Sequence, residues 1–437
     1  MVAGRSRDTN EKGADMSKEK NIPVERRSFL QATGATVTAA GLAGCRGSNE
    51  TSKFQIGALA PMDSSTGRSI KNSAKLAAME LNENGGINGK DVEIVAKDTK
   101  GNSSTGKTEY QNLVLDDKVN MTVGVYVSEV LMAIMDDIAE TESVHFTTGA
   151  ATPRVSTKVS QEYDKYKYHF RTGPLNAIQL GQNLADFSLA KFSDMGWNNV
   201  YMLLEDYEWT KAIEKVVGQT IQQSDLNLVG NERFPADTND YGTLYNKVEE
   251  RDADAAFVAM AHTGGTAISS WARDRRPFGF GGVHVPSQLP AFYEQSKKTA
   301  AYTVTQNVAT PQSELTKHTQ PFIEAYKDNF NGLPVYTGYI TYDAVKQYAQ
   351  TVSDMDGDPS NSDEVVSALE ESSYTGTIGT IEYHGKGHEH AHDVIYSKDK
   401  VNPVIQQWQP NEDGGGNQEV IYPPEYATTE YKPPRWI

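Results

Sequence analysis

The feature that most constrains the fold of this chain is an alternation of short apolar runs with longer amphipathic stretches between residues 54 and 273. Phe54–Ala60 and Ala255–Met260 are typical of buried strands, whereas Ala177–Phe192 repeats its apolar residues at helical spacing. Alternation at this spacing predicts right-handed crossovers and parallel sheets with helices on both faces. The units are too many for one comfortable sheet, so we expect an α/β chain with two domains.

Each predicted element follows from its hydrophobic period and from flanking turn residues. The predicted strands are Phe54–Ala60, Val92–Ala96, Met121–Val125, Val144–Thr147, Val200–Leu204, Leu226–Phe234 and Ala255–Met260. The predicted helices are Ile70–Leu81, Ser103–Asp117, Val130–Ala139, Ala177–Phe192, Thr210–Gln222, Tyr241–Glu250 and Gly265–Arg273. Ser128 is placed to cap the helix that starts near Val130.

After about residue 305 the pattern changes. The spacing of apolar residues predicts helices over Leu315–Asn329, Tyr339–Val352 and Val365–Leu369. Gly376–Tyr396 is expected to form two short strands around a loop. The tail from Pro410 is rich in Gly, Pro and Tyr, and its pattern predicts no element.

The composition excludes several classes of function. The chain carries 41 Lys+Arg against 58 Asp+Glu, a formal net charge of −17. A nucleic-acid binder needs a basic surface to displace counterions, so no nucleic-acid partner is expected. The single cysteine, Cys45, excludes an internal disulfide framework and a zinc site of paired cysteines. No apolar stretch has the length of a transmembrane helix.

The N-terminal region has the order of an export signal. Arg26 and Arg27 precede a mild apolar stretch that ends in Leu-Ala-Gly-Cys at Cys45. The arginine pair resembles a twin-arginine signal, and the final four residues resemble a lipoprotein box. We therefore expect a signal peptide over residues 1–44, starting at Met1 or Met16, and a lipidated Cys45 with its tether over residues 45–53. Export by this route, with a lipid on the outer face of the cell membrane and an acidic surface, suggests a salt-loving organism.

Four stretches occur together in an order and spacing that match a known family. They are Ile56–Pro61 with Ala74–Lys90, Gly124–Ser128 with Thr147–Thr152, Asp240–Tyr241 with Ala253–Val258, and Tyr326–Tyr336 with Thr341–Val345. Together they resemble the type I periplasmic substrate-binding proteins of ABC importers, in the branch that binds branched-chain amino acids and amides. The resemblance covers about residues 54–400.

This resemblance implies two Rossmann-like lobes with parallel central sheets, joined by three hinge crossovers, that close on a ligand in the cleft between them. The N-terminal lobe is expected to hold residues 54–172 plus 307–375, and the C-terminal lobe residues 173–306 plus 376–437. The crossovers are expected near Arg171–Pro174, Thr303–Val308 and Thr375–Gly379.

The candidate site starts where the strand Met121–Val125 ends. Open α/β sheets bind ligands at that edge, and backbone amides at a helix N-terminus hold a carboxylate or carbonyl well. By resemblance, Ser128, Ala150 and Thr152 match positions that hold a ligand's carboxylate and amino group, and Tyr126 belongs to the same stretch. Ser128 as a simple helix cap and Thr152 as a turn hydroxyl are the alternatives.

The second lobe is expected to contribute aromatic and polar groups. Tyr207 matches a family aromatic residue that closes over the ligand, and Trp209 is near enough in sequence to help. Aromatic rings suit a cation or an apolar chain; ordinary packing is the alternative. Thr263 stands where amino-acid binders have a tyrosine. His262 and His284 are candidate polar contacts or structural histidines.

One departure from the family affects the expected ligand. Amino-acid binders place a carboxylate after the strand near Gly281–Val285 to pair with the α-ammonium, and no acid stands there in this chain. A buried ammonium without a charged partner is costly. Asp206 or Asp343 could substitute. Otherwise the ligand could be an amide, a urea-like solute or a carboxylate.

A cluster of histidines near the C-terminus is the only candidate metal site. Its members are His384, His388, His390 and His392. Alternate histidines on a strand share one face, so weak metal binding is possible, although a simple loop is the favoured interpretation. No phosphate loop or nucleophile elbow occurs, so no catalytic residue, cofactor or enzymatic activity is expected.

The sequence therefore predicts a secreted, lipid-anchored solute-binding protein of an ABC importer. Its expected partners are a small polar solute, such as a branched-chain or other amino acid, and the permease and ATPase subunits. One alternative is the ligand-sensing module of a receptor. A metal-dependent enzyme that uses the cluster from His384 to His392 is the less favoured alternative.

Overall fold

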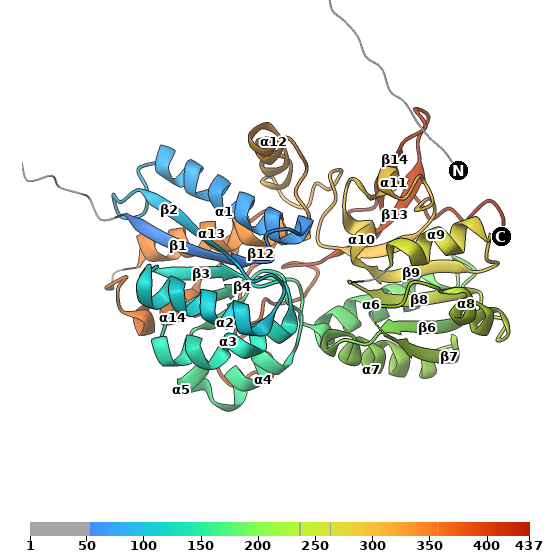
Figure 1. The fold of residues 1–437 in the computed structure, drawn as a ribbon, viewed down its shortest axis with the longest axis horizontal. Helices are drawn as coiled ribbons and strands as arrows, with labels where there is room; N and C mark the ends of the chain where they lie inside the picture. The colour runs from blue at the N-terminus through green and yellow to red at the C-terminus, as the bar shows by residue number, and fades with distance from the viewer. Residues whose placement is uncertain (1–52, 236, 263, 356) are drawn as a thin grey trace, which may run out of the picture. The chain divides into compact units, whose positions relative to one another are not determined.

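The computed structural model of the chain describes residues 53–437, apart from positions 236, 263 and 356. The predicted signal residues Arg26 and Arg27 and the predicted lipidation residue Cys45 lie outside the described residues. Within the described residues, two parallel sheets form two lobes (Figure 1). No helix in this part of the chain is long and apolar enough to cross a membrane.

The first lobe is built on a five-stranded parallel sheet in the order β2-β1-β3-β4-β5. Its strands are β1 (Phe54–Ala60), β2 (Val92–Asp98), β3 (Met121–Gly124), β4 (His145–Thr147) and β5 (His169–Arg171). The side chains of Ile56, Ala58 and Val123 are fully buried, because helices cover both faces of a parallel sheet. The register aligns Leu59 with Gly124, so β1 and β3 end at the same edge.

Helices α1 and α13 pack together over one face of this sheet, and α2 and α3 pack over the other (Figure 1). The helices of the first lobe are α1 (Ser65–Glu83), α2 (Ser103–Gln111), α3 (Ser128–Thr141), α4 (Arg154–Gln161), α5 (Tyr163–Tyr166), α12 (Thr319–Phe330), α13 (Tyr336–Asp354) and α14 (Ser362–Glu371). A short π-helix, η1 (Asn112–Asp116), follows α2 directly. The predicted helix Ser103–Asp117 is therefore α2 followed by η1.

The second lobe is built on a four-stranded parallel sheet in the order β7-β6-β8-β9. Its strands are β6 (Asn199–Glu205), β7 (Asn227–Phe234), β8 (Ala255–Met260) and β9 (Gly279–His284). Its helices are α6 (Ala177–Lys191), α7 (Glu208–Gln222), α8 (Gly242–Glu249), α9 (Gly265–Arg273), α10 (Val285–Gln288) and α11 (Phe292–Gln295). The predicted bounds of β8 and α9 are those of the structure, and the two-lobed α/β prediction is confirmed.

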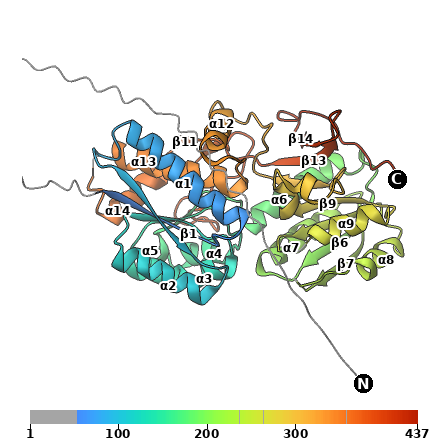
Figure 2. The same ribbon diagram turned by 45° about the horizontal axis from the view of Figure 1, so that its top comes forward.

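Residues near the C-terminus, including part of the tail from Pro410 for which the sequence predicts no element, form a hairpin. Strands β13 (Val404–Pro410) and β14 (Gly416–Tyr422) are antiparallel, and β13 also pairs with β10 (Val304–Asn307). Figure 2 shows the hairpin in the second lobe, away from the strands of the first lobe. Residues after β14 return along it, where the side-chain amide of Gln407 donates to the carbonyl of Lys432 at 2.8 Å.

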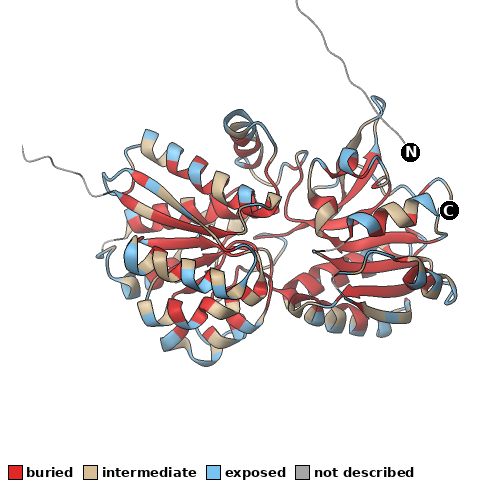
Figure 3. Cartoon of the chain, viewed as in Figure 1, coloured by how far each residue is buried: buried red, intermediate tan, exposed pale blue. Residues whose placement is uncertain are grey.

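The strands carry most of the buried surface, and the helices expose their outer sides (Figure 3). One apolar cluster runs through the first lobe and continues into the second at Leu180, Trp209 and Val308. A separate cluster around Trp271 and Phe278 fills the outer part of the second lobe. The two lobes are therefore continuous through the segments that join them.

The segment that follows the third expected crossover, near Thr375–Gly379, contacts both lobes. Residues 376–393 pack on the first lobe, where the Tyr383 ring lies edge-on to Phe170 at 4.9 Å and its hydroxyl donates to Gln347 at 2.7 Å. The same segment also contacts α6 of the second lobe: His384 and the carbonyl of Val394 lie 3.2 Å from the side-chain amide of Gln179, and the Tyr396 hydroxyl donates to Asp186 at 2.7 Å. The lobe boundary expected at residue 376 stays a prediction. Two short paired strands, β11 (Tyr374–Thr375) and β12 (Thr380–Ile381), lie at this point of the chain.

The segment after β11 is fastened to the first lobe by Asp343 of α13. The fully buried Asp343 carboxylate accepts hydrogen bonds from the backbone amides of Thr377 and Ile378 and from the Thr377 hydroxyl, at 2.8–3.2 Å. Burial raises the pKa of this carboxyl to about 7, because desolvation penalises the charged form more than these donors favour it.

The raised pKa predicts a pH dependence of stability. Between the unfolded pKa, about 3.9, and the folded value of about 7, the native state binds more protons than the unfolded state. The contribution of Asp343 is therefore present in full at low pH and declines as pH rises, by at most about 1.4 kcal/mol per pH unit. Replacement of Asp343 by Asn should remove this decline of the free energy of unfolding with pH. The measurement is urea unfolding at several pH values between 4 and 7.

The matched control is Asp328→Asn, because Asp328 is exposed on α12. That variant should keep the slope of the wild-type protein. Parallel curves for the wild-type protein and Asp343→Asn would contradict the assigned pKa shift.

Candidate binding site between the lobes

The candidate site begins in a tight turn at the carboxyl end of β3. Gly124 has a φ of +124°, and a Cβ there would lie 2.2 Å from the carbonyl oxygen of Leu59, so only glycine fits. The next residue, Val125, has a φ of 62°, a left-handed conformation that is rare for a β-branched side chain. Such backbone strain clusters at functional sites, and here it directs Tyr126 and Val127 to the start of α3.

The N-terminus of α3 presents unpaired backbone donors. Its cap residue is Val127, which offers no side-chain hydrogen bond, so the prediction that Ser128 caps this helix is wrong. Ser128 is instead the first helical residue, and its hydroxyl oxygen accepts from the amide of Thr152 at 3.2 Å. No described residue accepts from the amides of Ser128 or Glu129, so both are available to a ligand.

Arg171 fixes the loop that faces this helix end. Its fully buried guanidinium pairs with Asp393 at 3.0 Å and donates to the carbonyls of Ala150 and Thr152. Asp393 also accepts from Ser156 and Asn176, each at 2.6 Å. A buried carboxylate with three partners is well compensated, so the loop is held rigidly with its carbonyls turned away from the α3 amides.

A second buried carboxylate shapes the opposite wall. The side chain of Glu205, at the end of β6, is fully buried and accepts from the amides of Ala261 and His262 at 2.6–3.1 Å. The His262 ring stacks on Tyr207 at 4.0 Å with an interplanar angle of 11°. It also lies 5.9 Å from the ring of Tyr126 in the first lobe. Aromatic groups of both lobes therefore meet at this point.

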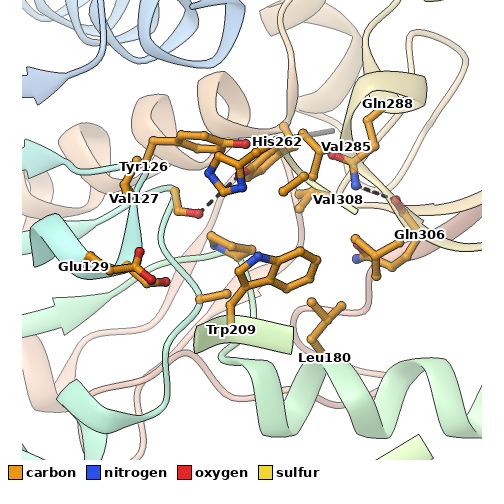
Figure 4. A pocket seen from close by; sticks show the side chains of 17 residues that line it. Tyr126, Val127, Glu129, Leu180, Trp209, His262, Val285, Gln288, Gln306 and Val308 are labelled. Carbon is orange, nitrogen blue, oxygen red and sulfur yellow. Dashed lines mark hydrogen bonds between the residues drawn. The ribbon is translucent and has the colours of Figure 1, made fainter. Parts of the chain in front are cut away.

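Between these walls lies a cavity of about 570 Å³, including its open side (Figure 4). The first lobe contributes Tyr126, Val127, Ser128, Glu129, Gly149, Ala151 and Tyr336. The second lobe and the crossovers contribute Pro174, Leu180, Trp209, Ala261, His262, Val283, Val285, Gln288, Gln306 and Val308. Most of these side chains are apolar or aromatic, with few polar atoms, which is typical of a small-molecule site.

Three of the predicted site residues line this cavity: Tyr126, Ser128 and His262. Ala150 and Thr152 lie directly behind the lining and position it through Arg171 and Ser128. Tyr207 lies on the open side of the cleft, stacked behind His262. Thr263 lies outside the described residues.

His284 and the two candidate acids do not line the cavity. The fully buried His284 ring is within 2.9 Å of the Gly264 carbonyl and accepts from the Ser287 amide at 3.1 Å, and burial lowers its pKa to about 4. It caps α10 as a neutral residue. Asp206 pairs with Arg233 at 3.0 Å and is largely exposed, and Asp343 is committed to Thr377.

Sequence reasoning missed several lining residues. Leu180, Val308 and Tyr336 come from elements whose strongest sequence signal is ordinary core packing. Gln288 lies in α10, directly after β9, in the region where the family acid was sought. Trp209 was noted only as a neighbour of Tyr207. The side chains of Trp209 and Gln288 are buried and carry polar atoms, which only the folded arrangement brings into one cavity.

The C-terminal histidines have other partners. The rings of His384 and His388 stack at 3.8 Å, and the buried His392 stacks on Phe170 at 4.1 Å and lies 2.8 Å from a Glu370 oxygen. Among residues 53–437, apart from the three undescribed positions, no three His, Cys, Asp or Glu side chains are arranged to hold a metal ion.

Two lobes with parallel sheets, joined by crossovers and enclosing a cavity at their carboxyl edges, define a two-lobed binding protein of the type I periplasmic class. The family model described as periplasmic binding protein matches residues 53–397, and the chain belongs to that family.

Individual similarities are more distant. The chain is 26% identical over 239 residues to the chemotactic signal transduction substrate-binding protein BasB of Halobacterium salinarum, covering 54% of each chain. The chain spans only 54–58% of the length of the curated relatives that it matches.

Two solved structures show the shared fold. The branched-chain amino acid transporter substrate-binding protein LivJ of Streptococcus pneumoniae, in complex with isoleucine, has a TM-score of 0.69 at 20% identity, covering 85% of this chain and all of that one. A solute-binding protein of an ABC transporter from Rhodopseudomonas palustris HaA2, in complex with p-hydroxybenzoic acid, has a TM-score of 0.70 at 16% identity, covering 87% and 98%.

The buried ion pair behind the site gives a stability prediction. Arg171→Met should leave Asp393 buried without its cationic partner and lower the free energy of unfolding by about 3–5 kcal/mol, measured by urea denaturation. Lys386→Met is the matched control, because it breaks the largely exposed pair with Asp164. That change should cost less than about 1 kcal/mol. Equal losses for the two variants would contradict a central role for Arg171.

Proposed function

We propose that this chain is an extracytoplasmic solute-binding protein that captures a small carboxylate-bearing solute between its lobes and delivers it to an ABC importer. The observation that carries the proposal is the cavity itself. The unpaired amides of Ser128 and Glu129 open into it beside walls that both lobes supply. No covalent step is involved.

The ligand's anionic group is assigned to the start of α3. The helix has 14 residues, so its partial positive charge adds to the two free amides. The Ser128 hydroxyl oxygen already accepts from Thr152, which leaves its hydrogen free to donate to the ligand. Of the three family positions, Ser128 is therefore the direct contact of the ligand, and Ala150 and Thr152 position it.

Closure of the second lobe over the first supplies the other wall. In the structure the lobes meet through the Tyr126 and His262 rings and through a long pair between Arg154 and Glu208 at 3.9 Å. An ion pair this long and this exposed contributes little. The ligand is therefore the principal source of the free energy that holds the cleft closed.

Delivery to a receptor is the second candidate function. It is favoured by the similarity to BasB, whose name places it in chemotactic signal transduction. Both functions need the same ligand-driven closure. They differ in the partner that recognises the closed form, a permease in one case and a transducer in the other.

The proposed location of the protein, on the outer face of the cell membrane, depends on its N-terminal residues. Export through Arg26 and Arg27 and a lipid on Cys45 would hold the protein at the outer face of the membrane, where a captured solute reaches a permease. One lipid chain binds reversibly and two or more hold firmly. The net charge of −17 keeps such a protein soluble, and the halophilic assignment rests on this acidity together with the signal.

Ligand binding should be visible as stabilisation. A solute present at 100 times its dissociation constant adds about 2.7 kcal/mol to the stability of the native state, so a panel of amino acids, amides and small carboxylates is screened by thermal unfolding at low and high KCl. Ser128→Ala should raise the dissociation constant of the solute found in this screen by about tenfold, since hydrogen bonds to charged groups are worth about 1.5–3 kcal/mol.

Ser104→Ala is the matched control, because Ser104 is exposed on α2 and does not line the cavity. It should leave affinity unchanged. No stabilisation by any solute of the panel would overturn the proposed function, and equal binding by the two serine variants would remove Ser128 from the site.

A further inference from the structure

Two buried polar atoms of the cavity lining have no partner among the described residues: Nε1 of Trp209 and Oε1 of Gln288. Trp209 is 7% exposed and Gln288 is 4% exposed. Buried polar groups in native proteins are nearly always hydrogen-bonded. We therefore expect the ligand of this cavity to supply an acceptor for the unpaired donor and a donor for the unpaired acceptor. Figure 4 shows the two side chains on different sides of the cavity.

The orientation of the Gln288 amide is fixed by its neighbour. Its Nε2 donates to the backbone carbonyl of Gln306 at 2.7 Å. A carbonyl accepts and does not donate, so the NH₂ group must face Gln306 and the oxygen must face away from it. The free oxygen therefore requires a ligand hydroxyl or N–H.

Trp209 needs the opposite kind of ligand group, a hydrogen-bond acceptor. Its indole N–H only donates, so it requires a ligand acceptor. Trp209 lies in the first turn of α7, and α7 contacts α3, whose free amides also donate. A carboxylate suits such donors, because an ionised carboxylate only accepts hydrogen bonds.

Two carboxylates of the described residues lie at the cavity, Glu205 behind its wall and Glu129 in its lining. Glu205 is committed to the amides of Ala261 and His262. Glu129 lines the cavity, but it is only half-buried and borders the open side of the cleft as well. The amide oxygen of Gln288 is the one buried side-chain acceptor of the lining that has no partner among the described residues.

We propose that the ligand is a small carboxylate with an apolar ring or branched body and a neutral hydrogen-bond donor, a hydroxyl or amide N–H, and that it is not an α-amino acid. Trp209 binds its carboxylate end and Gln288 its neutral donor. This inference rests on the proposed function and names the chemical class of solute for the same cavity.

The test is isothermal titration of the purified chain with two matched sets of acids. One set is 4-hydroxybenzoate and benzoate; the other is 2-hydroxy-4-methylpentanoate, 4-methylpentanoate and leucine. In at least one set the hydroxylated acid should bind about tenfold more tightly than the acid without the hydroxyl, because a site built to bind a hydroxyl rejects the analogue that lacks it.

Two variants separate the roles of the two side chains. Gln288→Met keeps the length of the side chain but removes the acceptor, so the ratio between the hydroxylated and unhydroxylated acids should fall to near one. Trp209→Phe removes the donor. The dissociation constants of both acids should therefore rise by about tenfold, while the ratio between the two constants is kept. Thermal unfolding confirms that each variant is folded. A variant that unfolds is replaced by Gln288→Leu or Trp209→Leu, for which the same ratios are expected.

The outcomes distinguish this inference from the proposed function. If leucine binds more tightly than its hydroxy acid, the inference is overturned and solute binding stands; Glu129→Gln would then identify the ammonium partner by abolishing leucine binding. A hydroxyl preference below twofold in both sets overturns the inference as well. If no acid and no amino acid binds, the proposed function itself fails.

Discussion

The buried ion pair between Arg171 and Asp393 is the interaction on which the architecture and the site both depend. It joins the end of β5 to residues 392–394, which extend the sheet edge through hydrogen bonds between Arg171 and both His392 and Val394. The same guanidinium holds the carbonyls of the loop that faces α3. The same carboxylate accepts from Asn176, whose own side chain caps α6 in the second lobe. Crossover, binding loop and first helix of the second lobe are thus one hydrogen-bonded unit.

The cavity in front of this unit has the opposite character, because several of its polar atoms have no partner among the described residues. The amides of Ser128 and Glu129, the indole N–H of Trp209 and the amide oxygen of Gln288 come from three elements in two lobes. Burying such groups without partners costs about 1–3 kcal/mol each. A ligand that completes them recovers this cost only when the lobes are closed. Recognition and closure therefore share one physical cause.

Much of the fold could be predicted from the sequence. Strand–helix alternation identified β1, β8 and α9 with their bounds, because parallel strands buried on both faces are continuous apolar runs. The β13–β14 hairpin was missed because its apolar residues do not alternate regularly with its Gln, Asn and Glu residues. The contacts of the segment after the third expected crossover were not predictable for a similar reason. Residues 376–393 carry few apolar residues, and their attachment depends on single buried contacts such as Asp343 with Thr377.

The site was predictable in outline and not in detail. The turn Gly124–Ser128 marks a strand end that precedes a helix, and this pattern located the first-lobe wall. Whether a buried side chain faces the cavity or lies behind it depends on packing that no local pattern reveals. His284 and Tyr207 were expected in the lining and lie behind it or outside it, whereas Gln288 and Trp209 are in it.

The central claim is that a ligand closes the two lobes on each other. The direct measurement is the distance between spin labels at Glu140→Cys on α3 and Lys215→Cys on α7, both exposed positions, in a chain whose Cys45 is replaced by Ser. Without ligand the account predicts a long and broad distance distribution, and with the solute that stabilises the protein a shorter and narrower one. A distribution that ligand leaves unchanged would contradict closure as the mechanism of capture.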